Sequence, residues 1–160
     1  MTFIERLCTV LNNQGINYAL VGGHAVALYG AVRGTVDVDF VLDWSLENLT
    51  KTETSLSQME LVSRLPINAQ NVFENRDSYI SDRNLIAWNF YNPQNLTEQV
   101  DIIINYSLEP NSIKNVEVGS TNVPLLDLEE LLEMKRRSAR AQDLHDIAAL
   151  EELYKEELNK

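Results

Sequence analysis

The sequence predicts an α/β fold, a small sheet flanked by helices, in one domain spanning residues 1–160. Short apolar runs of the kind found in buried strands occur at 16–21, 36–42 and 99–105. Apolar residues at helical spacing occupy both ends of the chain, and glycine or polar turn signals separate the runs. At 160 residues, with 44% hydrophobic and 23% charged residues, the chain is long enough to bury a core.

The beginning of the chain is predicted to form a helix, a strand, a second helix and a second strand. Phe3, Leu7 and Val10 recur at helical spacing, and Gly15 is well placed to end the first helix. The predicted bounds are 2–14 for the first helix, 16–21 for the strand, 23–29 for the second helix, 30–35 for a loop and 36–42 for the second strand.

The middle of the chain has weaker signals. Ser45 is a predicted cap for a helix that ends before Pro66, with apolar positions at Leu46, Leu49, Leu56, Met59 and Leu61. Residues 66–84 are polar and mixed, so we expect irregular structure with at most one group of helical turns. A strand at 85–91 precedes a turn at 92–95, and its aromatic residues are interpreted as packing residues rather than a base-stacking platform.

The end of the chain is predicted to add a hairpin and two helices. The hairpin strands are at 114–118 and 122–126, around Gly119-Ser120. Asp127 and Glu130 have the spacing of a capping box, which opens a helix from Leu128. The last helix has an apolar stripe of Leu144, Ile147, Tyr154 and Leu158. Residues 1–126 are therefore the predicted sheet-bearing core, and 127–160 are two C-terminal helices.

Two carboxylates and two glycines make the stretch from Leu20 to Leu42 the most informative. On a strand, Asp37 and Asp39 project from the same face and repel each other unless a cation lies between them. A hard divalent ion such as Mg²⁺ suits these oxygen ligands. Gly22 and Gly23 permit a tight turn and let backbone N–H groups approach a phosphate. The alternative is a buried strand–turn–helix unit with an incidental acidic pair.

Asp101 is the one charge in an otherwise apolar predicted strand. A carboxylate among Val100, Ile102, Ile103 and Ile104 is costly to bury without a partner. It fits the sequence if this strand neighbours the acidic strand and joins the same metal site. The alternative is an aspartate that points to solvent from a one-sided strand.

A basic cluster near the end of the chain also has two interpretations. It consists of Lys135, Arg136, Arg137 and Arg140. These cations would stabilise the C-terminal end of a helix, or they would bind the triphosphate of a nucleotide.

The glycine and aspartate motifs together resemble the signature of the nucleotidyltransferase superfamily that includes DNA polymerase beta. The finer pattern, Gly22-Gly23-His24-Ala25, Gly30, Arg33, Thr35, Asp37 and Asp39, resembles a small bacterial branch that includes AbiEii-type toxins. The closing run of Leu131, Lys135, Arg140, Asp143 and Asp146-Ile147 resembles the same branch. The sequence departs from that branch at Gln142, where a basic residue is usual, and at Tyr29, where histidine is common. Asp143 has a second interpretation as the N-cap of the last helix.

The resemblance implies a mixed sheet that carries the three aspartates, with the C-terminal helices closing a nucleotide site. It implies transfer of a nucleoside monophosphate from a nucleoside triphosphate to an acceptor, with release of pyrophosphate. Asp37, Asp39 and Asp101 would be the catalytic residues and the ligands of Mg²⁺, or of Mn²⁺. The implied nucleotide-binding residues are Gly22, Gly23, Arg33, Thr35, Lys135 and Arg140.

The net charge of −11 lowers the expectation of a long nucleic acid as the acceptor. We therefore expect a small molecule or a protein, although transfer RNA stays open, as does an aminoglycoside or lincosamide antibiotic. Two rival functions are a partner-regulated protein of toxin–antitoxin type, with weak or no catalysis, and a degenerate member that only binds nucleotide. The lone Cys8 and the lack of a long apolar segment predict a cytoplasmic protein with no membrane partner.

Overall fold

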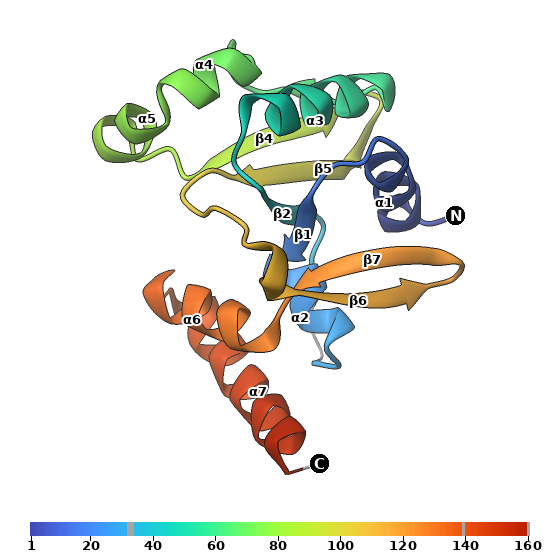
Figure 1. Cartoon of the computed structure of the whole chain (residues 1–160), viewed down its shortest axis with the longest axis vertical. Helices are drawn as coiled ribbons and strands as arrows, with labels where there is room; N and C mark the ends of the chain where they lie inside the picture. The colour runs from blue at the N-terminus through green and yellow to red at the C-terminus, as the bar shows by residue number, and fades with distance from the viewer. Residues whose placement is uncertain (32–33, 139, 160) are drawn as a thin grey trace.

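The computed structural model describes residues 1–31, 34–138 and 140–159. These residues form one seven-stranded sheet and its surrounding helices (Figure 1). The strands are β1 (Tyr18–Val21), β2 (Val38–Leu42), β3 (Val62–Ser63), β4 (Ala87–Asn92), β5 (Asn95–Ile103), β6 (Ile113–Val118) and β7 (Thr121–Leu126). The helices are α1 (Phe3–Asn13), α2 (Gly22–Leu28), α3 (Leu46–Gln58), α4 (Ala69–Glu74), α5 (Arg76–Arg83), α6 (Leu128–Ser138) and α7 (Ala141–Leu158), with a 3₁₀ turn, η1 (Pro110–Ser112).

Two parallel pairings join the centre of the sheet. The strand order is β3-β4-β5-β2-β1-β7-β6. Strand β2 runs parallel to β5 and β1 runs parallel to β7, whereas the other neighbours are antiparallel. The predicted α/β fold with a mixed sheet is confirmed.

One face of β4 and β5 is packed into the hydrophobic core. The side chains buried on it are Trp88, Phe90, Val100 and Ile102, and the residues between them are partly exposed. They share a core with Leu49 and Leu56 of α3, which lies across these strands in Figure 1. Each buried side chain of this size stabilises a fold by about 1.5–3 kcal/mol, so this packing fixes which face carries the remaining, polar residues.

The predicted order at the start of the chain is confirmed, with shifted bounds. Helix α1 is capped by Thr2, whose Oγ1 accepts a hydrogen bond from the Glu5 N–H, and Gly15 follows it with φ +68°. Strand β2 begins at Val38 rather than at 36. Asp37 therefore lies in the bend just before the strand and not within it.

Residues 66–84 are more helical than predicted, and the expected irregular structure is wrong. They contain α4 and α5. Helix α4 begins with a reciprocal pair in which the Asn68 and Asn71 side chains each accept from the other's backbone N–H at 2.9 Å. The signal was missed because Asn replaces the usual Glu or Gln. Helix α5 buries none of its residues and therefore lacks the apolar stripe that a sequence would reveal.

The elements on either side of that region also differ from prediction. Helix α3 ends at Gln58, because Glu60 adopts a left-handed conformation with φ 65°, and β3 follows. Strand β5 begins at Asn95 and ends at Ile103, earlier than the predicted 99–105. The predicted turn after β4 shortens to residues 93–94.

The hairpin and both C-terminal helices are present, but their caps differ. Asp127 Oδ1 accepts from the Glu130 N–H at 2.8 Å, whereas the Glu130 carboxylate accepts from the Tyr106 hydroxyl at 2.7 Å. Only half of the predicted capping box therefore forms. Asp143 is not the N-cap of α7: Arg140 occupies that position, and Asp143 lies three residues later.

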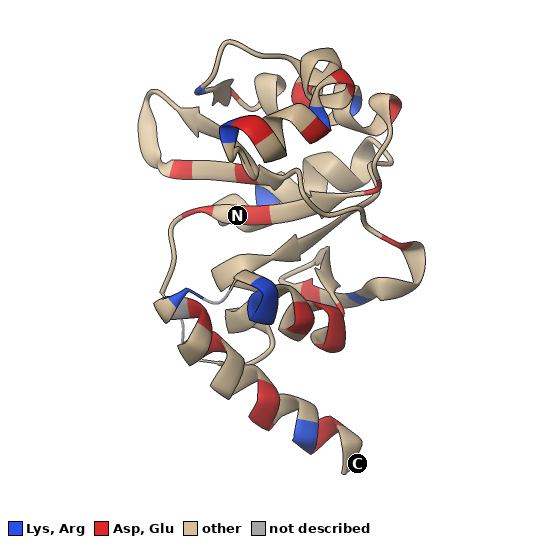
Figure 2. Cartoon of the chain, turned by 90° about the vertical axis from the view of Figure 1, so that its left-hand side faces the viewer, with Lys and Arg blue, Asp and Glu red and all other residues tan. Residues whose placement is uncertain are grey.

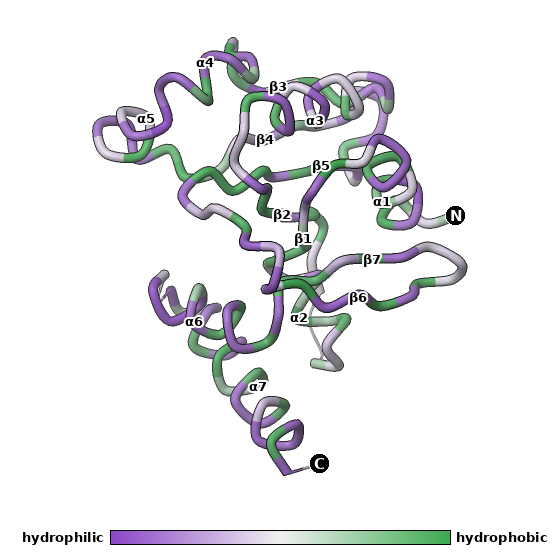
Figure 3. The backbone as a smooth tube through the Cα atoms, viewed as in Figure 1, coloured by the Kyte–Doolittle hydropathy of each residue, from purple (hydrophilic) through white to green (hydrophobic). Residues whose placement is uncertain are grey.

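Helices α6 and α7 pack against each other below the sheet in Figure 1. Apolar and polar residues alternate along both helices (Figure 3). Within the described ranges, no helix has the length and apolar character needed to cross a membrane.

Candidate active site

Asp39 and Asp101 lie directly opposite each other on the parallel strands β2 and β5. The alternating side-chain directions of a strand place both carboxylates on the face opposite the buried core. Among the described residues, Oδ1 of Asp39 is buried without a hydrogen-bond partner. Asp101 Oδ1 accepts from Asn89 Nδ2 at 2.7 Å. The prediction that the strand of Asp101 neighbours the acidic strand is therefore confirmed.

The electrostatics of this pair favour a bound cation. Burial, followed by the charge of Asp101, raises the pKa of Asp39 from 3.8 to about 7. Partial burial and Asp101 also raise the pKa of Asp37, while Arg64 and His24 act in the opposite direction. Two carboxylates that destabilise each other's charge are the arrangement that a divalent cation stabilises.

The three aspartates are neighbours but do not form a complete set of ligands. Over the residues that the structure describes, no group of three or more His, Cys, Asp or Glu side chains is arranged to hold a metal ion. Asp39 and Asp101 form a pair, and Asp37 precedes them in the bend before β2. A metal held here would take its remaining ligands from water or a substrate phosphate, as Mg²⁺ usually does.

Gly22 and Gly23 have no room for side chains. Gly22 has φ +67°, and a Cβ on it would lie 2.2 Å from Asp39 Oδ2. A Cβ on Gly23 would lie 2.8 Å from Cβ of Thr35. The first turn of α2 therefore lies directly against the acidic strand and the loop before it, which holds Asp39 beside free helical N–H groups.

Lys135 and Arg140 contact aspartates of α7. Lys135 Nζ lies 3.2 Å from Asp146 Oδ2 and 3.3 Å from Asp143 Oδ1, and its side chain is only 7% exposed. Arg140 Nε lies 2.9 Å from Asp143 Oδ2, with 62% of its side chain exposed. Burial opposes the charge of Asp143, but hydrogen bonds from Arg140 and Ser138 outweigh it and keep the pKa of Asp143 well below its usual range.

A cleft of about 320 Å³ joins the acidic strand to α6. Gly22 and Asp39 line one side, and Lys135 and Arg140 line the other. Its remaining walls include Ile86, Ile103, Asn105, Tyr106, Met134 and Arg137. Figure 2 shows the basic residues of α6 as a compact patch on a chain whose acidic residues are widely spread. The cleft therefore combines the Asp39 carboxylate, three cationic side chains and apolar surface.

Three other positions singled out in the sequence are Thr35, Tyr29 and Arg33. Thr35 Oγ1 points to the Asp37 carbonyl oxygen at 3.4 Å, so Thr35 lies beside both Gly23 and the acidic bend. The Tyr29 hydroxyl donates a hydrogen bond to the Leu126 carbonyl at 2.6 Å, which joins the end of α2 to the end of β7. The predicted site residue Arg33 lies outside the described residues.

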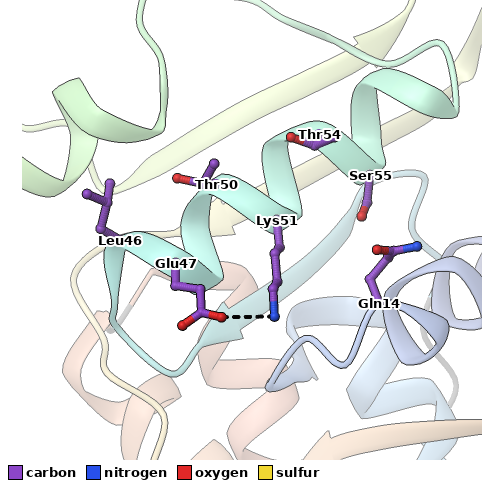
Figure 4. A pocket seen from close by; sticks show the side chains of 7 residues that line it. All are labelled: Gln14, Leu46, Glu47, Thr50, Lys51, Thr54 and Ser55. Carbon is purple, nitrogen blue, oxygen red and sulfur yellow. Dashed lines mark ion pairs between the residues drawn. The ribbon is translucent and has the colours of Figure 1, made fainter.

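A second depression lies on α3 and does not have the features of an active site. Gln14, Glu47, Thr50 and Lys51 are among its lining residues, and Glu47 pairs with Lys51 at 3.1 Å (Figure 4). It contains none of the three aspartates or the paired glycines. Exposed pairs of this kind contribute little to stability or binding.

Two residues beside the aspartates were missed in the sequence. Asn89 faces Asp101 across β4 and β5, and its alternation with Trp88 and Phe90 could have placed it on the polar face. Arg64 follows β3 and contacts Asn89 through Nε. Nothing in the polar sequence around Arg64 predicts that contact, because it depends on the pairing of β3 with β4.

Comparison with known proteins supports the fold. No protein-family model matches the sequence, and no curated protein matches it. The lincosamide antibiotic adenylyltransferase LnuA, with lincomycin bound, superposes with a TM-score of 0.65 at 13% identity, over 94% of this chain and 96% of that one. The chain has a nucleotidyltransferase fold.

Further solved structures also superpose on this chain. The antibiotic-resistance factor ANT(2'')-Ia superposes with a TM-score of 0.63 at 10% identity, over 92% of this chain and 80% of that one. A nucleotidyltransferase-like protein from Paracoccidioides brasiliensis gives a TM-score of 0.59 at 19% identity, over 92% and 72% of the two chains. The resemblance to nucleotidyltransferases is thus confirmed at the level of fold, and the narrower one to AbiEii-type toxins stays a prediction.

Proposed function

We propose that this protein is a metal-dependent nucleotidyltransferase that moves a nucleoside monophosphate from a nucleoside triphosphate to a small-molecule hydroxyl. The observation that carries the proposal is the pairing of Asp39 with Asp101 across β2 and β5. It is supported by the first turn of α2 against Asp39 and by the cations across the cleft. The nucleotidyltransferase fold supports it independently.

The residues present fit a divalent cation. Oδ1 of Asp39 is buried without a hydrogen-bond partner, so a cation beside it would give it a ligand to bind. The same positive charge would lower the raised pKa of Asp39. Asp39 and Asp101 would hold Mg²⁺ or Mn²⁺, with Asp37 as a further ligand and water or phosphate oxygens as the rest. When bound, the cation supplies charge neutralisation at the attacked phosphate and the leaving pyrophosphate.

The remaining tasks belong to the side chains and backbone of this chain. The first turn of α2, with Thr35 beside it, would bind the triphosphate through backbone N–H groups. Arg140, most of whose side chain is exposed, would add a charge-assisted contact. Asp101 would accept the proton of the acceptor hydroxyl as its oxygen attacks the α-phosphorus.

Lys135 has a different part in this proposal from the one its sequence position suggests. Its ammonium group is already bound by Asp143 and Asp146. It would therefore contribute to the triphosphate site through its field at Asp39, whose pKa it lowers, and by holding α7 and Arg140 in place. Arg33 stays a proposed contact from the sequence alone.

A small acceptor is favoured over a long nucleic acid. The net charge of −11 opposes a polyanion, and the cations of α6 lie at the cleft assigned to the triphosphate. Two proteins of the same fold are described with lincomycin and with adenylyl-2''-tobramycin bound. These are small-molecule ligands of those proteins, and they support a small acceptor for this one.

The test is to supply each α-labelled nucleoside triphosphate with Mg²⁺ to a fractionated lysate of the source organism. We expect label in the metabolite fraction with wild-type protein and none with Asp37→Ala or Asp39→Asn. Label in transfer RNA would contradict the proposed acceptor. Label in no fraction, despite metal-dependent nucleotide binding, would favour the rival function of a partner-regulated protein of toxin–antitoxin type.

A further inference from the structure

The face of β4 and β5 that carries Asp101 extends away from the cleft. The side chains on this face are partly exposed: Asn89 and Tyr91 on β4, and Gln99, Asp101 and Ile103 on β5. Ile103, two residues beyond Asp101, lines the cleft. Gln99, two residues before Asp101, pairs with Tyr91 and does not line it. Asp101 therefore has the cleft on one side and a separate polar surface on the other.

Arg64 lies over that polar surface. Its guanidinium carbon is 4.3 Å from the centre of the Tyr91 ring, and its Nη2 donates to Gln99 Oε1 at 3.3 Å. Its Nε donates to Asn89 Oδ1. All three partners are neutral, and over the part of the chain that the structure describes Arg64 forms no ion pair with a carboxylate. A guanidinium held by neutral groups keeps its charge available to an anion.

One amide connects this cation to the proposed reaction. Asn89 accepts from Arg64 at Oδ1 and donates to Asp101 Oδ1 from Nδ2. Two hydrogen bonds to opposite ends of one amide place Arg64 Nε within about 7 Å of Asp101 Oδ1. The charge of Arg64 also reaches Asp37, whose pKa it lowers against the effects of burial and Asp101.

We infer that the acceptor is a small hydroxy compound with one anionic group, phosphate or carboxylate, which Arg64 binds on the open face of β4 and β5. This inference rests on the proposed function and names the substrate class of the same site. The charge of Arg64 would offset the repulsion that the nearby aspartates exert on an anionic acceptor. Because Arg64 is a single cation rather than part of a basic track, it suits one anionic group and not a polyanion.

The proposed reaction needs only the acceptor and the triphosphate as reactants. The acceptor oxygen forms a bond to the α-phosphorus, and its proton passes to Asp101. The bond from the α-phosphorus to the bridging oxygen breaks, and pyrophosphate leaves with that electron pair. Arg64 takes no part in bond changes; it holds the anionic group so that a hydroxyl a few bonds away reaches Asp101.

The first test uses the charge of the native acceptor. A protein-free and nuclease-treated metabolite extract is passed over an anion exchanger, and each fraction is supplied with the full chain, Mg²⁺ and α-labelled triphosphate. We expect acceptor activity in the retained fraction, sensitive to phosphatase for a phosphate ester and resistant for a carboxylate. Activity confined to the unretained fraction, or activity that nuclease or protein removal abolishes, would overturn the inference. Absence of labelling in every fraction would also count against it.

The second test uses Arg64 and a matched control. With the retained fraction as acceptor, Arg64→Ala should raise the KM for acceptor about tenfold or more, and raise the KM for triphosphate by less. Arg64→Lys should recover part of the loss, and Arg83→Ala, another exposed arginine, should change neither constant. An equal rise in both constants, or none in that for acceptor, would overturn the inference. Metal-dependent stabilisation of the same samples by triphosphate shows separately whether the proposed function itself has failed.

Discussion

A Cβ atom on residue 22 would lie 2.2 Å from Oδ2 of Asp39, and the backbone there has φ +67°. Both facts require glycine at position 22, and both follow from the approach of α2 to the acidic strand. Glycine at position 22 therefore allows the first turn of α2 to lie against the Asp39 carboxylate before any nucleotide binds.

Gly22→Ala should destabilise the protein by about 1–3 kcal/mol, because alanine at positive φ is strained and its Cβ displaces Asp39. The midpoint of thermal unfolding measures this. Gly34→Ala is the matched control, since a Cβ there meets nothing within 4 Å, and it should stay within about 0.5 kcal/mol of wild type. Equal stability of the two variants would show that Gly22 is not held against Asp39.

Asp39→Asn should change how the free energy of unfolding depends on pH in metal-free protein. The pKa of Asp39 rises from 3.8 to about 7 on folding. The free energy of unfolding of the wild type is therefore highest, relative to that of the variant, below pH 3.8. That advantage is lost as the pH rises through about 7, leaving Asp39→Asn the more stable protein by roughly 1–3 kcal/mol.

Denaturant unfolding in chelator at pH 4, 6 and 8 measures this difference. Asp82→Asn, on the exposed surface of α5, is the control and should give no such crossover. Parallel pH curves for wild type and Asp39→Asn would contradict the electrostatic description of the site.

Lys135→Met should destabilise the protein by about 3–5 kcal/mol, because it removes the ammonium group that contacts both buried carboxylates, Asp143 and Asp146. Arg136→Met, at a neighbouring position whose side chain is 50% exposed, should cost less than about 1 kcal/mol. Chemical denaturation of both variants gives the comparison. A small loss of stability in Lys135→Met would contradict this structural role and would favour direct binding of Lys135 to phosphate.

A nucleoside triphosphate at about one hundred times its dissociation constant should add roughly 2.7 kcal/mol to stability in the presence of Mg²⁺. The shift in unfolding temperature should disappear in chelator and in Asp39→Asn, because the carboxylates then repel the triphosphate or cannot hold the cation. A shift of equal size in chelator would show that the triphosphate binds independently of the aspartates.

The pairing of the two strands that carry Asp39 and Asp101 could be predicted from the sequence better than the structure around them. Asp101 could be assigned to a strand beside Asp39 because an isolated carboxylate in an apolar run needs a partner. The face of Asn89 is readable from alternation along β4. By contrast, the contact of Arg64 with Asn89 depends on the pairing of β3 and β4, and β3 has only two residues.

The partners of Lys135 and Arg140 could not be predicted from the sequence. The family resemblance implies that Lys135 and Arg140 contact the nucleotide, but a sequence motif does not reveal which carboxylates surround a lysine. Asp is common at helix N-caps, so the sequence alone favours that role for Asp143, whereas its burial depends on how α6 and α7 pack. Helix α5 was missed for the same kind of reason, because nothing in it is buried.

The most direct measurement follows both products of the proposed reaction in one sample. The full chain is incubated with α-labelled triphosphate, Mg²⁺ and the metabolite extract, and labelled adduct and pyrophosphate are quantified together. The proposed function predicts equal amounts of the two, loss of both in chelator, and a decrease of at least about a hundredfold in Asp39→Asn. Undiminished adduct formation by Asp39→Asn would contradict the assignment of transfer to the Asp39–Asp101 pair.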